Sequence, residues 1–213
     1  SVSISVAGNE QAGIEVIELT ALYLYQRIDI RLNNACFGAM DWFEELESER
    51  HIQTLISVNL IGTMLVTRAV LPDMLDRGSG HIINMVSVAG LIASPLISTY
   101  SASKYGLRAF TDSLRREVAP LGIKVSGIYP GPAETEFGSH LRKNRLRATI
   151  NRIIDLRMTS AYVARRVVEL AKYPQRSLII PWWFRIITTF DTLFPVVVDW
   201  ILYLFVKKTH KLE

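Results

Sequence analysis

Short apolar runs alternate along the chain with longer segments in which apolar residues recur at the period of a helix. This alternation is typical of a parallel sheet covered by helices, so the predicted fold class is α/β. The candidate strands are Val2–Val6, Ile28–Leu32, His81–Val86, Lys124–Tyr129 and Ser177–Ile180.

Helices are predicted in the gaps between these strands. One of them begins after Ser48, a candidate N-cap. Five of its apolar residues are expected to face the sheet: Ile52, Leu55, Ile56, Met64 and Leu65. The predicted helices cover about 11–25, from 49 onward, from Ser98 or Thr99 to before Pro120, and about Ser160–Lys172. Residues 1–180 are thus predicted to form one domain, followed by an apolar C-terminal extension over 181–213.

The composition predicts a folded protein without a metal or a disulfide. The chain is 49% hydrophobic and 21% charged, which is typical of globular rather than disordered proteins. A single cysteine, Cys36, excludes an internal disulfide, and no Cys/His cluster has metal-ligand spacing. The first residues have neither the basic nor the apolar region of a signal peptide, so we expect a cytoplasmic protein.

Positive charge gathers in two segments of the chain, whose net charge is +4. Two interpretations of the first segment stay open: a solvated helix face, or a patch that attracts an anionic substrate, an acyl-carrier phosphate or a membrane surface. It has no interleaved aromatic residues and no recognition motif, so no nucleic-acid partner is predicted. The basic residues are Arg142, Lys143, Arg145, Arg147, Arg152 and Arg157 in the first segment, and Lys207, Lys208 and Lys211 in the second.

Polar or conformationally special residues stand at the ends of three predicted strands. Asn33 follows one strand, Ser87 ends the next, and Pro130 and Gly131 follow a third. Ligands of open parallel sheets bind outside the carboxyl ends of the strands, so these residues are expected to converge on one cleft. That convergence predicts a functional site.

Tyr100 and Lys104 stand four residues apart at the start of a predicted helix, so they share a face, one turn apart. A free phenol has a pKa near ~10, and each unit of depression requires about 1.4 kcal/mol of differential stabilisation of the phenolate. A nearby ammonium can supply it. We therefore expect this pair to transfer protons near neutral pH.

These residues resemble the short-chain dehydrogenase/reductase family, whose hallmark Tyr-x-x-x-Lys follows a strand that ends in Ser. Further matches in the same order are Asn-Asn-Ala-Cys-Phe-Gly at 33–38, Ser-Val-Asn-Leu-Ile-Gly-Thr at 57–63 and Pro-Gly-Pro-Ala-Glu-Thr at 130–135. The resemblance covers roughly residues 20–137. It implies a Rossmann-like, doubly wound parallel sheet and an NAD(P)-dependent oxidoreductase.

The resemblance implies catalytic roles for four residues. Tyr100 would exchange a proton with the substrate oxygen while hydride moves, Ser87 would hydrogen-bond that oxygen, and Lys104 would lower the phenol pKa. Asn59 would hold a water that links Lys104 to solvent, and an asparagine inside a helix is costly without such a reason. The alternatives are structural: a core tyrosine, a strand-end serine, a surface lysine and an exposed asparagine.

The resemblance also implies a cofactor, either NAD or NADP, and the sequence does not distinguish the two. Asn33 and Ala35 would approach the cofactor at a strand end, and Lys104 would bind its nicotinamide ribose. The implied cofactor-binding residues are Asn33, Ala35, Tyr100, Lys104, Pro130, Gly131, Ala133 and Thr135.

The sequence departs from the family at the end that would hold the pyrophosphate. The Gly-rich turn Thr-Gly-x-x-x-Gly-x-Gly occurs nowhere in this chain, and Ser1 falls near the start of the family's third strand. We therefore expect a sheet that lacks the first two strands. Three explanations stay open: a fragment of a complete reductase, a truncated form that has lost activity, or a chain whose missing half another chain supplies.

Two substitutions lie near that end. Cys36 replaces the last glycine of the family's Asn-Asn-Ala-Gly, and Arg31 stands in a strand that is apolar in the family. An unpaired buried charge costs several kcal/mol. Arg31 therefore predicts that its strand is a solvent-facing edge of the sheet.

Residues 178–206 are dense in bulky apolar side chains, but Arg185, Asp191, Pro195 and Asp199 interrupt the run, and a spanning helix needs about 20 apolar residues. Two interpretations stay open. The extension covers the substrate cleft and a dimer surface, or residues 181–211 make a peripheral contact with a membrane, with tryptophans and lysines at the headgroups.

The predicted function is the interconversion of a lipophilic secondary alcohol and its ketone, or of an alcohol and its aldehyde. Gly106 lowers helix stability by roughly 1 kcal/mol relative to Ala, so close packing is expected there. In relatives that helix packs against its copy, which implies a homo-oligomer. The alternative function is that of a non-catalytic binding or scaffold protein that cannot hold a dinucleotide.

Overall fold

The computed structural model describes residues 27–134 and 158–210 of this chain. At its centre is a parallel sheet with the strand order β1-β2-β3-β6. The strands are β1 (Ile30–Asn33), β2 (Gly80–Met85), β3 (Ile123–Pro130) and β6 (Ser177–Ile180). This confirms the predicted parallel α/β fold. The strand predicted at 2–6 and the helix predicted at 11–25 lie outside the described residues.

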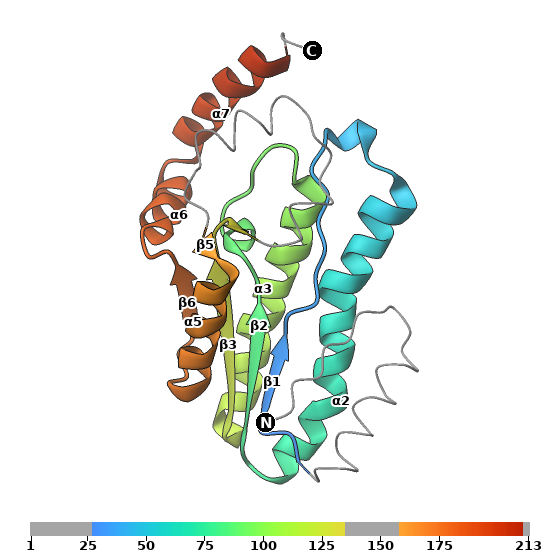
Figure 1. Ribbon diagram of the computed structural model, residues 1–213, viewed down its shortest axis with the longest axis vertical. Helices are drawn as coiled ribbons and strands as arrows, with labels where there is room; N and C mark the ends of the chain where they lie inside the picture. The colour runs from blue at the N-terminus through green and yellow to red at the C-terminus, as the bar shows by residue number, and fades with distance from the viewer. Residues whose placement is uncertain (1–26, 135–157, 211–213) are drawn as a thin grey trace.

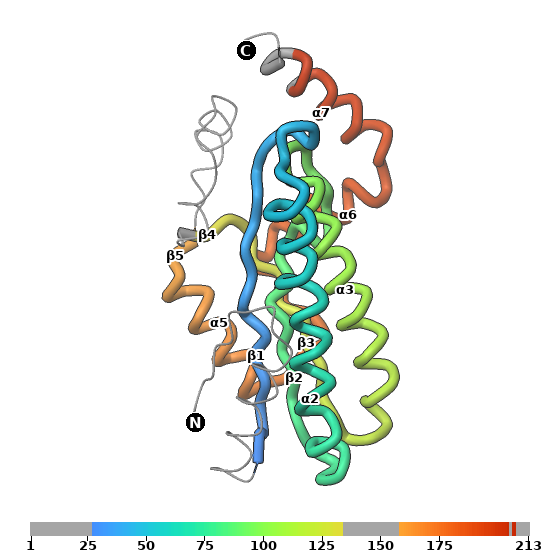
Figure 2. The backbone as a smooth tube through the Cα atoms, turned by 90° about the vertical axis from the view of Figure 1, so that its right-hand side faces the viewer, coloured from blue at the N-terminus to red at the C-terminus, as the bar shows by residue number. Residues whose placement is uncertain are grey.

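Helices cover both faces of this sheet (Figures 1 and 2). α2 (Thr63–Asp76) and α3 (Ser98–Val118) lie on one face, and α5 (Ser160–Lys172) lies on the other. The bounds predicted for α3 and α5 are confirmed. The shorter elements are η1 (Phe43–Glu45), η4 (Val88–Gly90), η5 (Ala119–Leu121) and the paired strands β4 (Ala133–Glu134) and β5 (Met158–Thr159).

Two apolar clusters fill the space between the sheet and these helices. Ile82 belongs to one cluster and Ile83 to the other, because successive residues of a strand point to opposite faces. The first cluster contains Val70, Met74, Ile82, Leu114, Val118, Ile123 and Val125. The second contains Ile83, Ile128, Met158, Val167, Leu170 and Ile180. Burial of each such large side chain contributes about 1.5–3 kcal/mol, so both helical layers stabilise the sheet.

The helix that ends as α2 begins with two wide, π-helical stretches, η2 (Ser48–Thr54) and η3 (Ser57–Gly62). The helix starts at Ser48, one residue earlier than predicted, so its N-cap is Glu47 rather than Ser48, and no side chain caps it. By length and composition the whole helix, residues 48–76, could cross a membrane. In the described structure, however, α2 packs against β1 and β2.

The side of α2 that faces the sheet differs from the prediction. Met64 and Leu65 are only partly buried, whereas Val66, Val70 and Met74 are buried. A π-helical turn holds more residues than an α-helical turn. The wide turns of η2 and η3 therefore shift the face that a regular helical period predicts.

Strand β1 lies at one edge of the described sheet, as predicted. The prediction that Arg31 faces solvent is wrong: Arg31 is 8% exposed, and its Nε donates to Oδ1 of Asn33 at 3.0 Å. Asn33 in turn donates to Oδ1 of Asn84 at 2.8 Å and to Oγ1 of Thr67 at 3.1 Å. The strand can bury a charge because these hydrogen bonds replace contacts with water.

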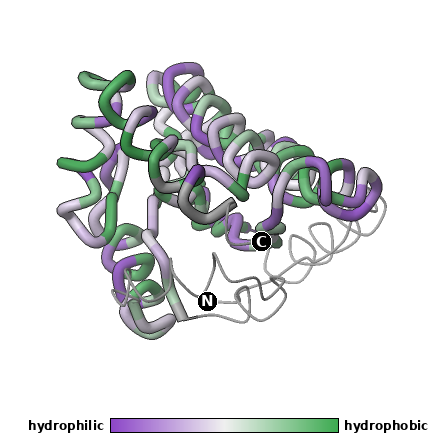
Figure 3. Tube along the Cα trace, turned by 90° about the horizontal axis from the view of Figure 1, so that it is seen from above, coloured by the Kyte–Doolittle hydropathy of each residue, from purple (hydrophilic) through white to green (hydrophobic). Residues whose placement is uncertain are grey.

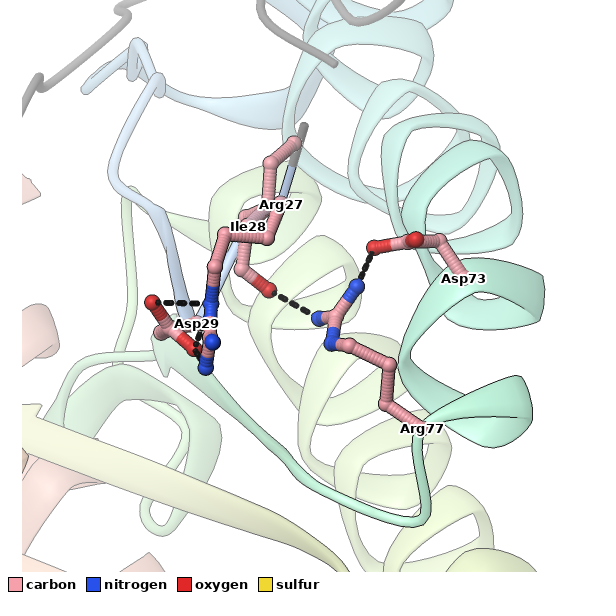
Figure 4. A network of polar contacts seen from close by, with 5 residues as sticks. All are labelled: Arg27, Ile28, Asp29, Asp73 and Arg77. Carbon is pink, nitrogen blue, oxygen red and sulfur yellow. Dashed lines mark hydrogen bonds and ion pairs between the residues drawn. The ribbon is translucent and has the colours of Figure 1, made fainter. Parts of the chain in front are cut away.

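Charged groups fix the entry of β1 against the end of α2 (Figure 4). Arg77 donates to the carbonyl oxygen of Ile28 at 2.7 Å and pairs with Asp73. Arg27 pairs with Asp29, and this hydrogen bond lowers the pKa of the Asp29 carboxyl. Because Arg77 binds a backbone carbonyl as well as a carboxylate, it fixes the position of the chain before β1.

Two glycines with positive φ lie in the turns before β2 and β3. Gly122 has φ +83°, and a Cβ there would lie 2.2 Å from the carbonyl oxygen of Gly78. Gly78 has φ +60°, and a Cβ there would meet nothing within 4 Å. Gly122→Ala should therefore lower the free energy of unfolding by more than Gly78→Ala, whose left-handed strain costs about 1–2 kcal/mol. Urea unfolding of both variants measures the difference. Equal losses of unfolding free energy in the two variants would contradict the clash between a Cβ at residue 122 and the carbonyl oxygen of Gly78.

His81 in β2 is a buried imidazole whose folded-state pKa is low. It is 4% exposed, and its Nε2 lies 2.8 Å from Oγ of Ser126, which itself donates to the carbonyl oxygen of Gln175. Burial, together with the positive charge of Lys124, lowers the pKa of His81 from 6.5 to about 4. The folded state therefore resists protonation of this ring.

The unfolding free energy should fall as the pH drops from 6.5 towards 4, because in this range the unfolded chain binds a proton that the folded chain excludes. The loss should reach up to about 3 kcal/mol for this group. Urea unfolding at several pH values measures it, with His81→Gln as the comparison. If the unfolding free energy of His81→Gln depends on pH as in the unaltered chain, other groups cause the loss of stability at low pH.

Candidate active site

Ser87 lies directly beyond β2 in a strained conformation. Its φ is +123°, a region that costs a residue other than glycine about 1–3 kcal/mol and that is concentrated at functional sites. The hydroxyl donates to the carbonyl oxygen of Pro130 at 3.4 Å, accepts from the amide of Ala89 at 3.2 Å and hydrogen-bonds the side chain of Tyr100. Ser87 thus connects the ends of β2 and β3 with the start of α3.

Tyr100 and Lys104 share one face of α3, as their spacing predicts. The Lys104 ammonium lies 5.6 Å from the centre of the Tyr100 ring. Lys104 is 1% exposed, and its Nζ donates to the carbonyl oxygen of Met85 at 3.0 Å. Within the part of the chain that the structure describes, this carbonyl is the one hydrogen-bond acceptor of a group with three N–H donors. The ammonium can therefore serve further acceptors from a ligand.

Burial dominates the electrostatics of both side chains. It raises the pKa of Tyr100 and lowers the pKa of Lys104. A negative charge on Cys36 raises both pKa values, and the hydrogen bond with Ser87 lowers the pKa of Tyr100. The net shift of Tyr100 is opposite to the expected depression by Lys104, so that expectation is wrong for the chain alone. At neutral pH the phenol is held protonated and can act as a proton donor.

Asn59 lies in η3 and is fully buried. Its amide donates to the carbonyl oxygen of Phe37 at 2.9 Å and accepts from the backbone N–H of Phe37 at 2.9 Å. It also donates to Oγ of Ser103 at 3.1 Å, and Ser103 donates to the carbonyl oxygen of Tyr100 at 2.7 Å. Asn59 therefore ties the segment after β1 to α3. Its water-holding role stays a prediction, and Ser103 is a supporting residue that the motif comparison missed.

The predicted cofactor residues Asn33 and Ala35 lie at and beyond the end of β1. Asn33 is 6% exposed and its side-chain amide is used in hydrogen bonds within the sheet, so this amide is already occupied. Ala35 is partly buried. The side-chain interactions of Asn33 could not be read from its place in a motif.

Pro130 is the last residue of β3, and Gly131 follows it. Ala133 lies in β4, and Thr135 lies outside the described residues. The amide of Gly131 donates to the carbonyl oxygen of Ile180 at 2.7 Å. A Cβ on Gly131 would lie 2.5 Å from Cε2 of Phe184, at the start of α6 (Phe184–Leu193). Sequence reasoning missed this contact, since only the bulky run at 181–184 hinted at packing there.

A pocket of about 520 Å³ lies on the other side of α3. The residues that line it are Ala93, Ser94, Pro95, Ser98, Ser101, Ala102 and Tyr105. By helical spacing, those on α3 face away from Tyr100 and Lys104. The pocket is therefore separate from the candidate active site.

The variant Asn59→Leu should lower the unfolding free energy by about 2–4 kcal/mol, because it leaves the N–H and C=O of Phe37 without their partner in a closely packed place. Ser103→Ala removes one bond of Asn59 and should cost about 1 kcal/mol. Urea unfolding of the two variants is the measurement. Similar losses would show that the contacts with Phe37 do not anchor this segment.

Known proteins resemble this chain in sequence and in structure. The sequence profile described as short chain dehydrogenase matches residues 8–146. An uncharacterized oxidoreductase of Staphylococcus saprophyticus is 32% identical over 160 residues, which cover 74% of this chain and 65% of that protein. A 3-oxoacyl-(acyl-carrier-protein) reductase of Synechocystis is 36% identical over 141 residues, which cover 65% of this chain and 57% of that protein.

A solved structure gives the same result. The crystal structure of a short-chain dehydrogenase from Streptomyces avermitilis matches with a TM-score of 0.77 and 29% identity, over 92% of this chain and 78% of that chain. The chain spans less than two thirds of the length of the two curated relatives above. Because the profile matches more than half of this chain, the chain belongs to the short-chain dehydrogenase family of oxidoreductases.

Proposed function

We propose that the chain carries the proton-transfer site of an NAD(P)-dependent oxidoreductase that interconverts a lipophilic secondary alcohol and its ketone, or an alcohol and its aldehyde. The observation that carries the proposal is the meeting of Ser87, Tyr100 and Lys104 at the ends of β2 and β3. The relative from Synechocystis is named a reductase of 3-oxoacyl groups, and an oxo group in such a chain is a ketone.

The chemistry of the site follows from the state of the phenol. Burial keeps Tyr100 protonated, so Tyr100 donates a proton to the carbonyl oxygen during reduction and becomes a phenolate. In the reverse direction the phenolate takes the proton of the alcohol hydroxyl as the alcohol is oxidised. The Ser87 hydroxyl donates a hydrogen bond to the same oxygen and stabilises the charge that develops on it. Asn59 is a positioning residue, because its hydrogen bonds to Phe37 and Ser103 hold the segment after β1 against α3.

The residues present fit the nicotinamide end of a cofactor, and members of this family use NAD or NADP. Lys104 has N–H donors to spare, and the hydroxyls of a ribose are acceptors for them. Gly131 and Ala133 add little bulk beside the backbone at the end of β3. Ala35, Pro130, Thr135 and the backbone of Asn33 complete the proposed contacts. When bound, the nicotinamide supplies or accepts the hydride.

The proposal includes a cytoplasmic homo-oligomer, with a peripheral membrane contact through residues 181–211. Gly106 no longer supports the oligomer, because a Cβ there would lie 2.8 Å from Cδ2 of Leu60 in the same chain. Packing of η3 on α3 within one chain thus explains this glycine. The oligomer is proposed from the family alone.

One observation favours a second candidate, a binding or scaffold protein without catalysis. The chain has no Gly-rich turn to hold a pyrophosphate, anywhere in its sequence. Measurement of cofactor binding separates the two candidates. The folded chain should quench or enhance the fluorescence of NADH or NADPH saturably. A folded chain that binds neither one at millimolar cofactor would support the scaffold.

Tyr100→Phe should lower kcat/KM for ketone reduction by at least about 100-fold, because it removes the proton donor. Cofactor affinity should stay within a few-fold, since the ring remains. The assay follows NADH or NADPH oxidation with a panel of lipophilic ketones and aldehydes. Tyr105→Phe is the matched control, because Tyr105 lies on the same helix and is 37% exposed. Equal activity in the two variants would remove Tyr100 from the mechanism.

A further inference from the structure

Helix α6 packs on the domain with the side that carries Phe184 and Thr188. Thr188 is 9% exposed, whereas Ile186 is 61%, Phe190 43% and Leu193 65% exposed. The three apolar residues follow the spacing i, i+4, i+7, which places them on one face of the helix. A surface helix of a globular protein normally buries such a stripe. In α6 the stripe faces outward.

Helix α7 (Pro195–His210) continues this apolar surface. Val197, Trp200, Ile201 and Leu204 recur at helical spacing and are between 44% and 62% exposed. Asp199 lies on the side of the helix opposite this stripe, whereas Lys207 follows Trp200 at i+7 and lies at the edge of the stripe. The Lys207 ammonium lies 5.6 Å from the centre of the Tyr203 ring. Helix α7 is thus apolar around most of its circumference, and Asp199 marks the side away from the stripe.

The bent arrangement of α6 and α7 suits binding at a membrane surface better than crossing the membrane. The two helices meet at a bend of 105° at the break after Leu193. They contain 10 and 16 residues, and each is shorter than the roughly 20 residues that cross a bilayer. Figures 1 and 2 show α6 beside the sheet layers and α7 leading away from them. Figure 3 shows hydrophobic stretches along the tail that leads to the C-terminus.

The extent of the exposed surface calls for a partner. Single exposed apolar residues are common, but contiguous patches on soluble proteins mark interaction sites. The exposed residues here are Trp182, Ile186, Ile187, Phe190, Leu193, Phe194, Val196, Val197, Trp200, Ile201, Tyr203 and Leu204. Exposed tryptophan and tyrosine beside aliphatic residues are typical of the interface between lipid tails and headgroups.

The charges around the patch favour an anionic surface. Arg185 is exposed at the start of α6, and Lys207, Lys208 and Lys211 follow the apolar run in the sequence. Of the two acids in the pair, Asp191 acts electrostatically on Tyr105 of the domain. Asp199 lies on the side of α7 away from the apolar stripe. Basic residues near a membrane surface are attracted to anionic lipids.

We propose that the outward faces of α6 and α7 dock on an anionic phospholipid membrane. Both helices lie in the plane of the interface, and the side of α7 with Asp199 faces the headgroups. The apolar stripes of both helices enter the boundary of the acyl chains.

The docking places a membrane beside the candidate active site. Phe184 at the start of α6 packs against Gly131, which follows β3. A lipophilic substrate would therefore reach the site from the lipid phase. The docking deepens the peripheral membrane contact of the proposed function, and the entry of substrate from the lipid phase rests on the proposed oxidoreductase activity as well.

Vesicle flotation of the full chain tests the docking. The probes are vesicles of phosphatidylcholine alone and of phosphatidylcholine with phosphatidylserine. The chain should float with the anionic vesicles, and Phe190→Glu should lower the bound fraction by about tenfold or more, because a charge replaces a large apolar side chain. Thr189→Glu is the matched control, because it adds the same charge beside the stripe and should keep most of the binding.

Further variants test the details of the docking. Trp200→Glu should repeat the loss from the second helix, and Lys207→Glu should weaken binding to anionic vesicles more than binding to neutral ones. Circular dichroism checks that each variant is folded, and Thr189→Glu shows the effect of charge on the helix itself.

Three outcomes would overturn the proposal. The first is a folded chain that stays unbound with both vesicles. The second is equal binding to neutral and anionic vesicles, which would remove the charge argument. The third is a dimer by light scattering that needs Phe190 and excludes vesicles, because a second copy would then cover the patch. Flotation uses neither cofactor nor substrate, so its failure is separate from failure of the proposed oxidoreductase.

Discussion

The arrangement of the site depends on one buried ammonium. Removal of a cation from water is costly, and the Lys104 ammonium recovers part of that cost from the carbonyl oxygen of Met85. This bond holds α3 against the end of β2. The fit is close, since a Cβ on Gly90 would lie 2.7 Å from the backbone oxygen of Lys104. With α3 held there, Tyr100 meets Ser87 without any further adjustment of the chain.

The two asparagine amides of the motifs act first as structural groups. The Asn59 amide binds the backbone of Phe37 on both of its sides, and the Asn33 amide binds Asn84 and Thr67. Each bond joins elements that are distant in the sequence. A motif of this kind therefore carries two kinds of information, the reacting groups and the groups that bring them together.

Local patterns predicted the parts of the structure that local physics determines. The bounds of β6, α3 and α5 followed from apolar runs, helical period and the stop at Pro174, and the spacing of Tyr100 and Lys104 gave their common face. The failures have tertiary causes. Arg31 is buried and donates to Asn33, whose own partners lie on other elements, and the direction of the Tyr100 pKa depends on how deeply the phenol is packed. The contact between Phe184 and Gly131 joins segments that no sequence period connects.

The ring of Phe184 has a practical consequence for anyone who handles this chain. An obvious way to raise the solubility of the chain is to remove the apolar residues that follow β6. That shortening would also remove the Phe184 ring that fills the space over Gly131, so the loop after β3 would lose a packing contact. Polar replacements on the outer stripe of α6 keep this contact, so they are the safer way to raise the solubility of the chain.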